Sequence, residues 1–366
     1  MKKALFVTYN NFYNKDTGGM QCSSRNYTMI SSEYDTDVYL AQSRFFDKLI
    51  SLFLWYFPTI TYKHNKEIID LILNNNYNLV FFDVSLFGIT LKKIARKNPK
   101  LNIVTFFHNV EYDYINVRFH KSIIKYLYQF LAWYNEKLTI KYSKLIISLN
   151  RRDSARLQEL YNRTPDIEIP ITFDDALKEE SLIQKWRNST ETNNTLLYVS
   201  SYNTNNFISV KWFVDNVLKH LSHEIKLIIV GKGFEIKKKE LEEIGNIEVA
   251  GTVENLSEYY LSADAIIAPI FKGAGMKVKI AEAYMFGKYI FGTDEAFEGY
   301  ILTNSTSVCN TKKEFIDSLN SFFTCKTRSK NSLENRVIFQ ENYSSEISTK
   351  KFNILYSKLE SFSNIN

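Results

Sequence analysis

The sequence predicts an α/β protein with two domains, each built on a parallel β-sheet that helices cover on both faces. Three observations predict this class. The chain has 366 residues, more than one hydrophobic core usually supports. Short, continuously apolar runs alternate with helix-length segments, which is the pattern of buried parallel strands. The alternation restarts near Thr195, after a polar stretch without a predicted strand.

The predicted strands fall into two groups. In the first half of the chain they cover residues 4–9, 37–41, 78–83, 103–108, 144–149 and 167–170. In the second half they cover residues 195–200, 226–231, 247–251, 263–269 and 289–293, with a weaker sixth around residue 308. Helix-length segments lie between them, among them 66–76, 123–141, 207–221, 237–244 and 313–323. Because helices separate the strands, neighbouring strands are expected to run parallel and to end at the same edge of each sheet.

The polar segment in the middle of the chain predicts the domain boundaries. We expect an N-terminal domain over residues 1–172, a linker over 173–194 and a C-terminal domain over 195–344. Apolar residues at helical spacing predict a final helix over 345–362, which we expect to pack back on the N-terminal domain. Since ligands of open parallel sheets bind beyond the carboxyl ends of the strands, we expect two Rossmann-like domains that face each other across a cleft.

Composition and charge limit the expected partners. The three cysteines are far apart and form no Cys-x-x-Cys pair, which favours a reducing, cytoplasmic compartment over a disulfide scaffold. The net charge of +6 comes mostly from residues 116–145. Within them, Lys121–Tyr134 combines lysines with aromatic residues, so we expect peripheral attachment to an anionic membrane surface at the inner face, with 44–57 as a second patch. A core helix fits this segment equally well. Nucleic acid is not expected, because no binding motif accompanies the basic stretch.

A strand, a glycine loop and a helix follow one another in the second half. The strand covers residues 263–269 and the helix covers 276–287, and the loop contains Gly273 and Gly275. Glycines let backbone N–H groups approach a ligand closely, and a helix N-terminus carries partial positive charge. This order of elements predicts a phosphate-binding site.

Three charged residues strengthen that prediction. Lys277 and Lys279 place two cations in the first turn of the helix, which is unfavourable there unless an anion binds. Glu282, farther along, offers a carboxylate to ribose hydroxyls. The alternative is an ordinary turn with solvated lysines, which explains the combination less well.

Two features of the first half also follow predicted strands. Gly18 and Gly19 precede a predicted helix and form a second glycine loop, although the pattern is not the Gly-x-Gly-x-x-Gly of dinucleotide sites. His108 leaves the fourth strand, with Glu111 nearby. A histidine at the end of a strand is well placed to face a cleft; the alternative is a buried, hydrogen-bonded histidine. No third ligand accompanies His108 and Glu111, so a metal is not expected.

Other strand ends carry weaker signals. Gly231 and Gly251 end two strands of the second half, and the backbone from Gly251 to Val253 is suited to pair with a base edge. Asp35 and Asp37 have the Asp-x-Asp form that chelates metal–nucleotides elsewhere. Because they precede a strand instead of ending one, we interpret them as a solvated loop.

Taken together, these residues resemble the GT-B glycosyltransferases, of the retaining kind grouped as glycosyltransferase family 4. The resemblance covers nearly the whole chain and is strongest from Gly251 to Gly299. It implies a donor-binding set, which comprises Gly18, Gly19, Gly231, Val253, Ala274, Gly275, Met276, Lys277, Lys279 and Glu282. Glu282 would bind the donor ribose, the two lysines would neutralise the diphosphate, and Val253 would meet the base. His108 is the implied catalytic residue and would touch the donor sugar near the reacting carbon.

The function that this resemblance implies is transfer of a sugar from a UDP- or GDP-type nucleotide sugar to a glycan or lipid-linked acceptor in surface polysaccharide biosynthesis. Retaining chemistry without metal or other cofactor is expected, because the lysines and the helix dipole stabilise the leaving diphosphate. Ala274 stands where many members carry a glutamate, which leaves the donor sugar open. Two alternatives remain: a sugar-nucleotide epimerase of related fold, and a catalytically silent GT-B subunit that supports a partner transferase.

Overall fold

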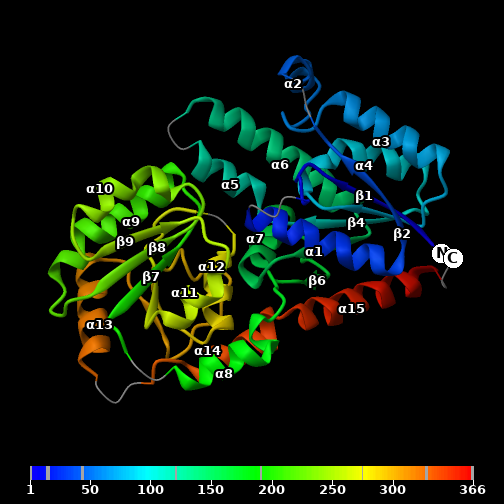
Figure 1. Cartoon of the computed structure of the whole chain (residues 1–366). Coiled ribbons are helices and arrows are strands. Elements are labelled where there is room, and N and C mark those ends of the chain that lie inside the picture. Colours follow the sequence, from blue (N-terminus) through cyan, green and yellow to red (C-terminus); the bar gives the residue numbers. More distant parts are fainter. Residues whose placement is uncertain are drawn as a thin grey trace. The chain divides into compact units, whose positions relative to one another are not determined.

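The computed structural model describes residues 2–13, 17–42, 45–119, 122–189, 192–273, 275–325 and 329–363 (Figure 1). The chain divides into two compact units. Unit 1 comprises Met1–Ile171 and Ser348–Asn366, and unit 2 comprises Thr172–Ile347.

In unit 1 the described residues form a six-stranded sheet of order β2-β1-β3-β4-β5-β6. Its strands are β1 (Lys3–Thr8), β2 (Asp35–Leu40), β3 (Leu79–Phe82), β4 (Asn102–Phe107), β5 (Leu145–Ser148) and β6 (Ile167–Glu168). All neighbouring strands pair in parallel. The central strands β3 and β5 are buried along their whole length, because helices cover both faces of the sheet.

The helices of unit 1 are α1 (Gly18–Glu33), α2 (Phe45–Phe53), α3 (Tyr62–Asn74), α4 (Gly88–Lys97), α5 (Glu111–Arg118), α6 (Ile124–Tyr142) and α7 (Arg151–Tyr161). Helices α3, α4 and α6 pack on one face of the sheet (Figure 1). On the other face lie α1 and the last helix, α15 (Ser345–Ser363), which begins in unit 2 and continues in unit 1. There the Phe352 ring of α15 meets Phe81 of β3.

In unit 2 the described residues form a second six-stranded parallel sheet, of order β12-β11-β10-β7-β8-β9. Its strands are β7 (Thr195–Val199), β8 (Lys226–Val230), β9 (Ile247–Gly251), β10 (Ala265–Ala268), β11 (Tyr289–Gly292) and β12 (Thr306–Val308). Its helices are α8 (Glu180–Asn188), α9 (Thr204–Asn216), α10 (Lys238–Glu242), α11 (Leu256–Ser262), α12 (Val278–Met285), α13 (Lys312–Thr324) and α14 (Leu333–Ile338). Helices α9, α10 and α13 share a core with one face of the sheet, and α11 and α12 lie on the other side (Figure 1).

The strand orders fix where a ligand is expected. The order reverses between β1 and β3 in unit 1 and between β7 and β10 in unit 2. In open α/β sheets the crevice beyond the carboxyl ends at such a reversal is the usual binding site. His108 follows β4 in unit 1, and the Gly273 loop follows β10 in unit 2. The predicted fold class, two helix-covered parallel sheets, is therefore confirmed.

Two details differ from the sequence-based interpretation. Asp35 and Asp37 are not a loop but the first residues of β2, because pairing with β1 begins at Lys3; the Tyr77 hydroxyl donates to Asp37 at 2.7 Å. The predicted linker 173–194 contains α8 and belongs to unit 2.

Hydrogen bonds explain why this polar segment is ordered. Asp175 forms a buried ion pair with Arg336, and the Arg336 guanidinium also donates to the Met285 carbonyl at 3.0 Å. The Trp186 indole donates to the Phe286 carbonyl at 2.8 Å. A stretch that is polar in composition is thus fixed on unit 2 by side-chain contacts that its own sequence does not reveal.

Large apolar side chains lie exposed on α2, on the segment after it and at the start of α6. They are Ile50, Phe53, Leu54, Trp55, Ile123, Ile124, Tyr126, Leu127 and Phe130, and we call them the apolar patch. The Trp55 ring lies 5.2 Å from that of Phe130. The second half of α6 is core, with Leu131, Ala132 and Ile140 buried. The core interpretation therefore holds for the second half of the helix, and membrane attachment of the exposed first half remains a prediction. Arg44 and Lys121 lie outside the described residues. Among the described helices, none has the length and apolarity to cross a bilayer.

Candidate active site

The glycine loop lies where the sequence predicts it, but the helix after it spans Val278–Met285 instead of the predicted 276–287, so Lys277 precedes the first turn. Strand β10 ends at Ala268 and Pro269 follows, which cannot donate to a sheet hydrogen bond. The chain enters α12 at Val278, with Lys277 as the extended N-cap residue. Gly273 and Gly275 precede it, and Met276 is buried. Ala274 lies outside the described residues. The loop thus leads to the N-terminus of α12, as required for a phosphate site.

Lys277 and Lys279 lie in very different surroundings. The Lys277 ammonium donates to Glu295 at 2.8 Å, to Glu298 at 3.2 Å and to the Gly275 carbonyl. Two carboxylates and a carbonyl therefore already compensate this cation, which fixes the shape of the loop. Its predicted role in holding a diphosphate remains a prediction.

Lys279 is the unusual cation. Its side chain is 9% exposed, and its Nζ is buried without a hydrogen-bond partner among the described residues. The ammonium lies 4.5 Å from the ring centroid of Tyr198, on β7, a cation–π contact. Burial lowers the pKa of Lys279 to about 7. The negative charge of Glu282 opposes this shift, and the positive charge of Lys277 adds to it. A buried ammonium without an acceptor is costly, and a bound anion would remove that cost.

Glu282 lies one turn farther along α12. The Tyr260 hydroxyl of α11 donates to its Oε2 at 2.9 Å, so a second helix orients the carboxylate. Burial raises the pKa of Glu282, while Tyr260 and Lys279 oppose that rise. The other carboxylate oxygen remains available to accept from a ligand hydroxyl.

The remaining predicted residues of unit 2 follow β8 and β9. A Cβ on Gly231 would lie 1.9 Å from the Ser200 carbonyl oxygen, and its φ is +147°, so close backbone packing alone accounts for this glycine. Glu235 accepts from the Thr252 amide. A hydrogen bond with the Thr252 side chain, followed by bonds from the backbone of Glu235 and Thr252, lowers the pKa of Glu235 to about 2. Val253, the next residue, makes no hydrogen bond to other described residues, which leaves its backbone amide and carbonyl open to a ligand.

In unit 1 a buried carboxylate organises the strand ends. Asp83 follows β3 and is fully buried. It accepts from Asn26 at 2.7 Å and from Thr8 at 3.2 Å, and His108 Nε2 lies 3.3 Å from its Oδ1. The network brings together the ends of β1, β3 and β4 with α1. Sequence reasoning found His108 but missed Asp83, although its position directly after a buried strand was the available signal.

The same network sets the charge of His108. Burial by itself lowers the pKa of His108, but the charges of Asp83 and Cys22 and hydrogen bonds to both raise it to about 10. The Ser23 hydroxyl lies 3.5 Å from Nε2 and accepts from Asn10 at 2.9 Å. His108 is therefore an oriented imidazolium at neutral pH, which suits it to stabilise negative charge and not to act as a general base.

Two further carboxyl groups lie buried near this network. Glu136, on α6, accepts from the Glu111 amide at 2.9 Å, from the Tyr161 hydroxyl at 2.7 Å and from Ser85 at 3.1 Å. Burial raises the pKa of Glu111 to about 8, with a further rise from Glu136 and opposition from His108. Burial also raises the pKa of Glu136 to about 7. Glu136 thus caps the start of α5 by accepting from its backbone amides. Glu111, three residues after His108, has a pKa above neutral and so keeps its proton at pH 7.

Gly18 and Gly19 open α1 instead of preceding it. The Thr17 hydroxyl caps the helix by accepting from the Met20 amide at 3.3 Å. A Cβ on Gly19 would meet nothing within 4 Å, so packing within the described residues does not require a glycine there. The open space above the first turn fits the predicted close approach of a ligand.

The described residues contain no group of three His, Cys, Asp or Glu side chains arranged to hold a metal ion. The polar groups that the structure does supply at the strand ends are an imidazolium in unit 1 and a buried ammonium with a carboxylate in unit 2. These groups are suited to bind an anion and a ribose.

Two parallel-sheet units with such sites define the class of the protein, a GT-B fold. Anabaena HepE, solved in complex with UDP and glucose, matches with a TM-score of 0.65 and 13% identity, covering 98% of this chain and 100% of that one. The lipopolysaccharide outer core galactosyltransferase WaaB matches with a TM-score of 0.63 and 14% identity over 98% and 100%. A glycosyltransferase from Rickettsia africae gives 0.61 and 15% over 98% of both chains. At such identities the likeness establishes the fold alone.

The match to a protein family lies in the second unit. Residues 193–323 match the family "Glycosyl transferases group 1", so the chain carries a group 1 glycosyltransferase domain. The matched span contains Tyr198, the Gly273 loop, Lys279 and Glu282. A search of curated proteins finds no match to the sequence.

Proposed function

We propose that this protein transfers a sugar from a nucleotide-diphosphate donor to a glycan or lipid-linked acceptor in surface polysaccharide biosynthesis. The observation that carries the proposal is the Lys279 ammonium, buried without an acceptor at the N-terminus of α12. This site lies in the group 1 glycosyltransferase domain. HepE, a structural neighbour, has been solved with UDP-glucose, which makes a UDP sugar the first donor to test.

The donor's diphosphate would occupy the start of α12. There the helix dipole and Lys279 both favour negative charge, and binding would restore the proton that burial makes easy to lose. Glu282, held by Tyr260, would accept from the ribose hydroxyls. Val253 would meet the base. The negative charge that develops on the leaving diphosphate is then stabilised by groups already in place.

His108 would act on the donor sugar as a cation. An imidazolium fixed by Asp83 is a hydrogen-bond donor at both ring nitrogens, so it would hold oxygen atoms near the reacting carbon and would not remove a proton. The acceptor hydroxyl would pass its proton to the departing phosphate. The reaction is proposed to retain configuration and to need no metal.

The acceptor side is proposed to lie at a membrane. The apolar patch on α2 and α6 is followed on α6 by Lys137, whose ammonium packs over Trp133 at 4.7 Å. Aromatic side chains with neighbouring lysines are suited to the interface of an anionic bilayer. We place the protein in the cytoplasm, attached peripherally to the inner face, and its three widely separated cysteines, without a Cys-x-x-Cys pair, fit that compartment.

Turnover with a donor panel tests the proposal. Purified protein is incubated with UDP- and GDP-sugars, and bound donors are detected by thermal stabilisation, which rises with ligand concentration by mass action. Release of nucleoside diphosphate, with and without lipid extract as acceptor, then measures transfer. Lys279→Met should abolish both signals, while the exposed lysine variant Lys313→Met should keep them.

The outcomes separate the alternatives. Stabilisation and release with one donor, increased by acceptor, support a transferase. Conversion of one nucleotide sugar into its epimer without release indicates an epimerase. Donor binding without any turnover indicates a silent subunit. Absence of binding to every nucleotide tested would refute the proposed donor site.

A further inference from the structure

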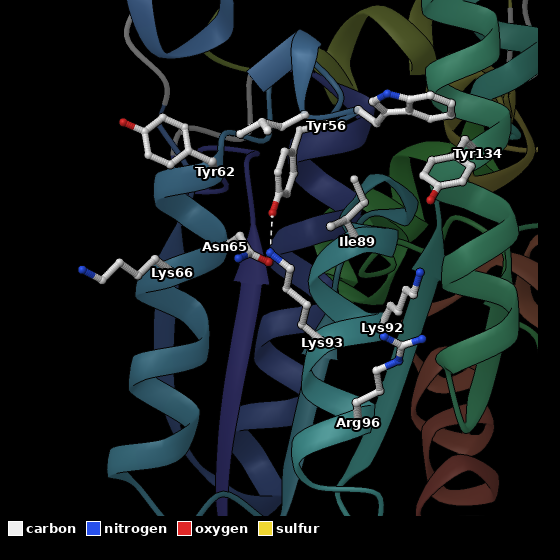
Figure 2. Close-up of a pocket in the computed structure, with 11 residues that line it drawn as sticks. Tyr56, Tyr62, Asn65, Lys66, Ile89, Lys92, Lys93, Arg96 and Tyr134 are labelled. Atoms are coloured by element: carbon white, nitrogen blue, oxygen red, sulfur yellow. Dashed lines mark hydrogen bonds between the residues drawn. The ribbon is translucent and has the colours of Figure 1, made fainter. Parts of the chain in front are cut away.

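Unit 1 contains a second built site, away from His108, on the outer side of helices α3, α4 and α6. It is a pocket of about 580 Å³, a size that holds a small ligand. Figure 2 shows Lys92, Lys93 and Arg96 projecting from α4 beside Tyr56, Asn65 and Tyr134. No part of the site described above lines this pocket.

The cations of the pocket lack carboxylate partners. Lys92 and Arg96 are one helical turn apart, a spacing at which like charges destabilise a helix. No ion pair joins Lys92, Lys93 or Arg96 to a carboxylate of the described residues, and Lys93 donates instead to the Tyr56 hydroxyl at 3.1 Å. Arg96 suits the negative end of α4, but Lys92 and Lys93 lie in its middle. An anion in the pocket would remove this repulsion.

A buried acceptor also faces the pocket. Asn65 is 6% exposed, and its Oδ1 has no hydrogen-bond partner among the described residues. A buried amide oxygen without a donor is costly, and a hydroxyl of a ligand would satisfy it. The pocket therefore offers cations for a phosphate and an acceptor for a neighbouring hydroxyl.

The pocket opens directly onto the apolar patch. Leu54 and Trp55 line the pocket and are also about half exposed. The Trp55 backbone has a φ of +66°, an unfavourable conformation for a bulky residue, and its carbonyl accepts from the buried Asn135 amide at 3.1 Å. Rigid placement of an aromatic ring between cations and an apolar surface suits an amphiphile, with its polar head in the pocket and its chain along the patch.

We infer that this pocket binds the phosphate-bearing headgroup of an anionic membrane lipid. The inference rests on the proposed membrane attachment and gives it a specific ligand and specific residues. Lys92, Lys93 and Arg96 hold the phosphate, Asn65 accepts from a headgroup hydroxyl, and the acyl chain covers Trp55 and the apolar patch. Phosphatidylglycerol, with one phosphate and free glycerol hydroxyls, has this chemistry.

The test compares two variants of equal charge. Lys92→Gln/Arg96→Gln removes two cations from the pocket, and Lys97→Gln/Lys100→Gln removes two exposed cations just beyond it. Partition onto vesicles of phosphatidylglycerol and phosphatidylcholine is measured by co-sedimentation. A basic residue at an anionic surface contributes about fivefold in binding, so the pocket variant should lose about 25-fold. The control, whose cations make no headgroup contact, should lose less than about threefold.

Each failure has a distinct meaning. If the wild-type protein does not bind phosphatidylglycerol vesicles, the proposed membrane attachment fails and this inference fails with it. If both variants lose binding equally, attachment stands but the pocket is refuted. If glycerol 3-phosphate stabilises the wild-type protein, and not the pocket variant, while vesicles do not bind, the ligand is a soluble phosphate and the lipid assignment is overturned. Stabilisation by UDP in the pocket variant checks that the protein is folded.

Discussion

Replacing Lys279 by methionine should make the ligand-free protein more stable while abolishing donor binding. Methionine fills a similar volume against Tyr198 without a charge. In the wild-type protein the ammonium is buried without an acceptor, and burial lowers its pKa from 10.5 to about 7. The charge that we expect to bind the diphosphate therefore destabilises the ligand-free protein.

The magnitude follows from the pKa values. Between pH 7 and 10.5 the unfolded chain holds a proton on Lys279 that the folded chain has lost, so the free energy of unfolding rises with pH across this range. The cost of the buried charge is fully present below pH 7 and is lost towards pH 10.5. At roughly 1.4 kcal/mol per pH unit, it is about 5 kcal/mol at pH 6 and about 2 kcal/mol at pH 9. Lys279→Met should recover these amounts.

Urea unfolding at pH 6 and pH 9 measures the gain, and calorimetric titration with UDP measures binding. Lys313→Met replaces an exposed lysine of the same unit and serves as the control. It should change the free energy of unfolding and the free energy of UDP binding by no more than about 0.5 kcal/mol. A Lys279→Met protein that is less stable than wild type at pH 6, or that binds UDP with unchanged affinity, would refute the reasoning.

Three further predictions concern the other buried groups. Asp83→Asn should lower the pKa of His108 from about 10, because the variant loses the charge of Asp83 while burial continues to disfavour the imidazolium and only Cys22 still opposes it; an unchanged imidazole titration by NMR would contradict this. Glu282→Gln should weaken UDP binding by roughly 1.5–3 kcal/mol through the lost charged hydrogen bond, measured by calorimetry against wild type. Burial raises the pKa of Glu111 to about 8, so the folded protein keeps a proton that the unfolded chain loses, and the free energy of unfolding should fall as pH rises from 4.5 to 8. Glu111→Gln should make this fall smaller in urea unfolding experiments. An equally steep fall in the variant would contradict the prediction.

The order of strands and helices could be predicted closely because apolar runs and polar breaks are local signals. The strand predicted at 226–231 is β8 (Lys226–Val230), and even the weak strand around residue 308 is β12 (Thr306–Val308). The segment 173–194 could not be placed in the same way. It joins unit 2 through contacts such as that of Asp175 with Arg336, which are 161 residues apart.

The candidate site could be predicted in its backbone but not in its electrostatics. The order of strand, glycine loop and helix could be predicted from spacing, although the helix begins at Val278 and not at Met276. The sequence gives no means to see that Glu295 and Glu298 neutralise Lys277 while Lys279 lies unpaired over Tyr198. Asp83 and Tyr260 were missed for the same reason, since each acts through a partner on another element.

A crystal structure with UDP bound tests the central claim most directly. We predict a diphosphate oxygen within hydrogen-bond distance of Lys279 Nζ at the start of α12, and the ribose hydroxyls on the Glu282 carboxylate. A nucleotide bound elsewhere, with Lys279 still unpaired, would contradict the proposed donor site.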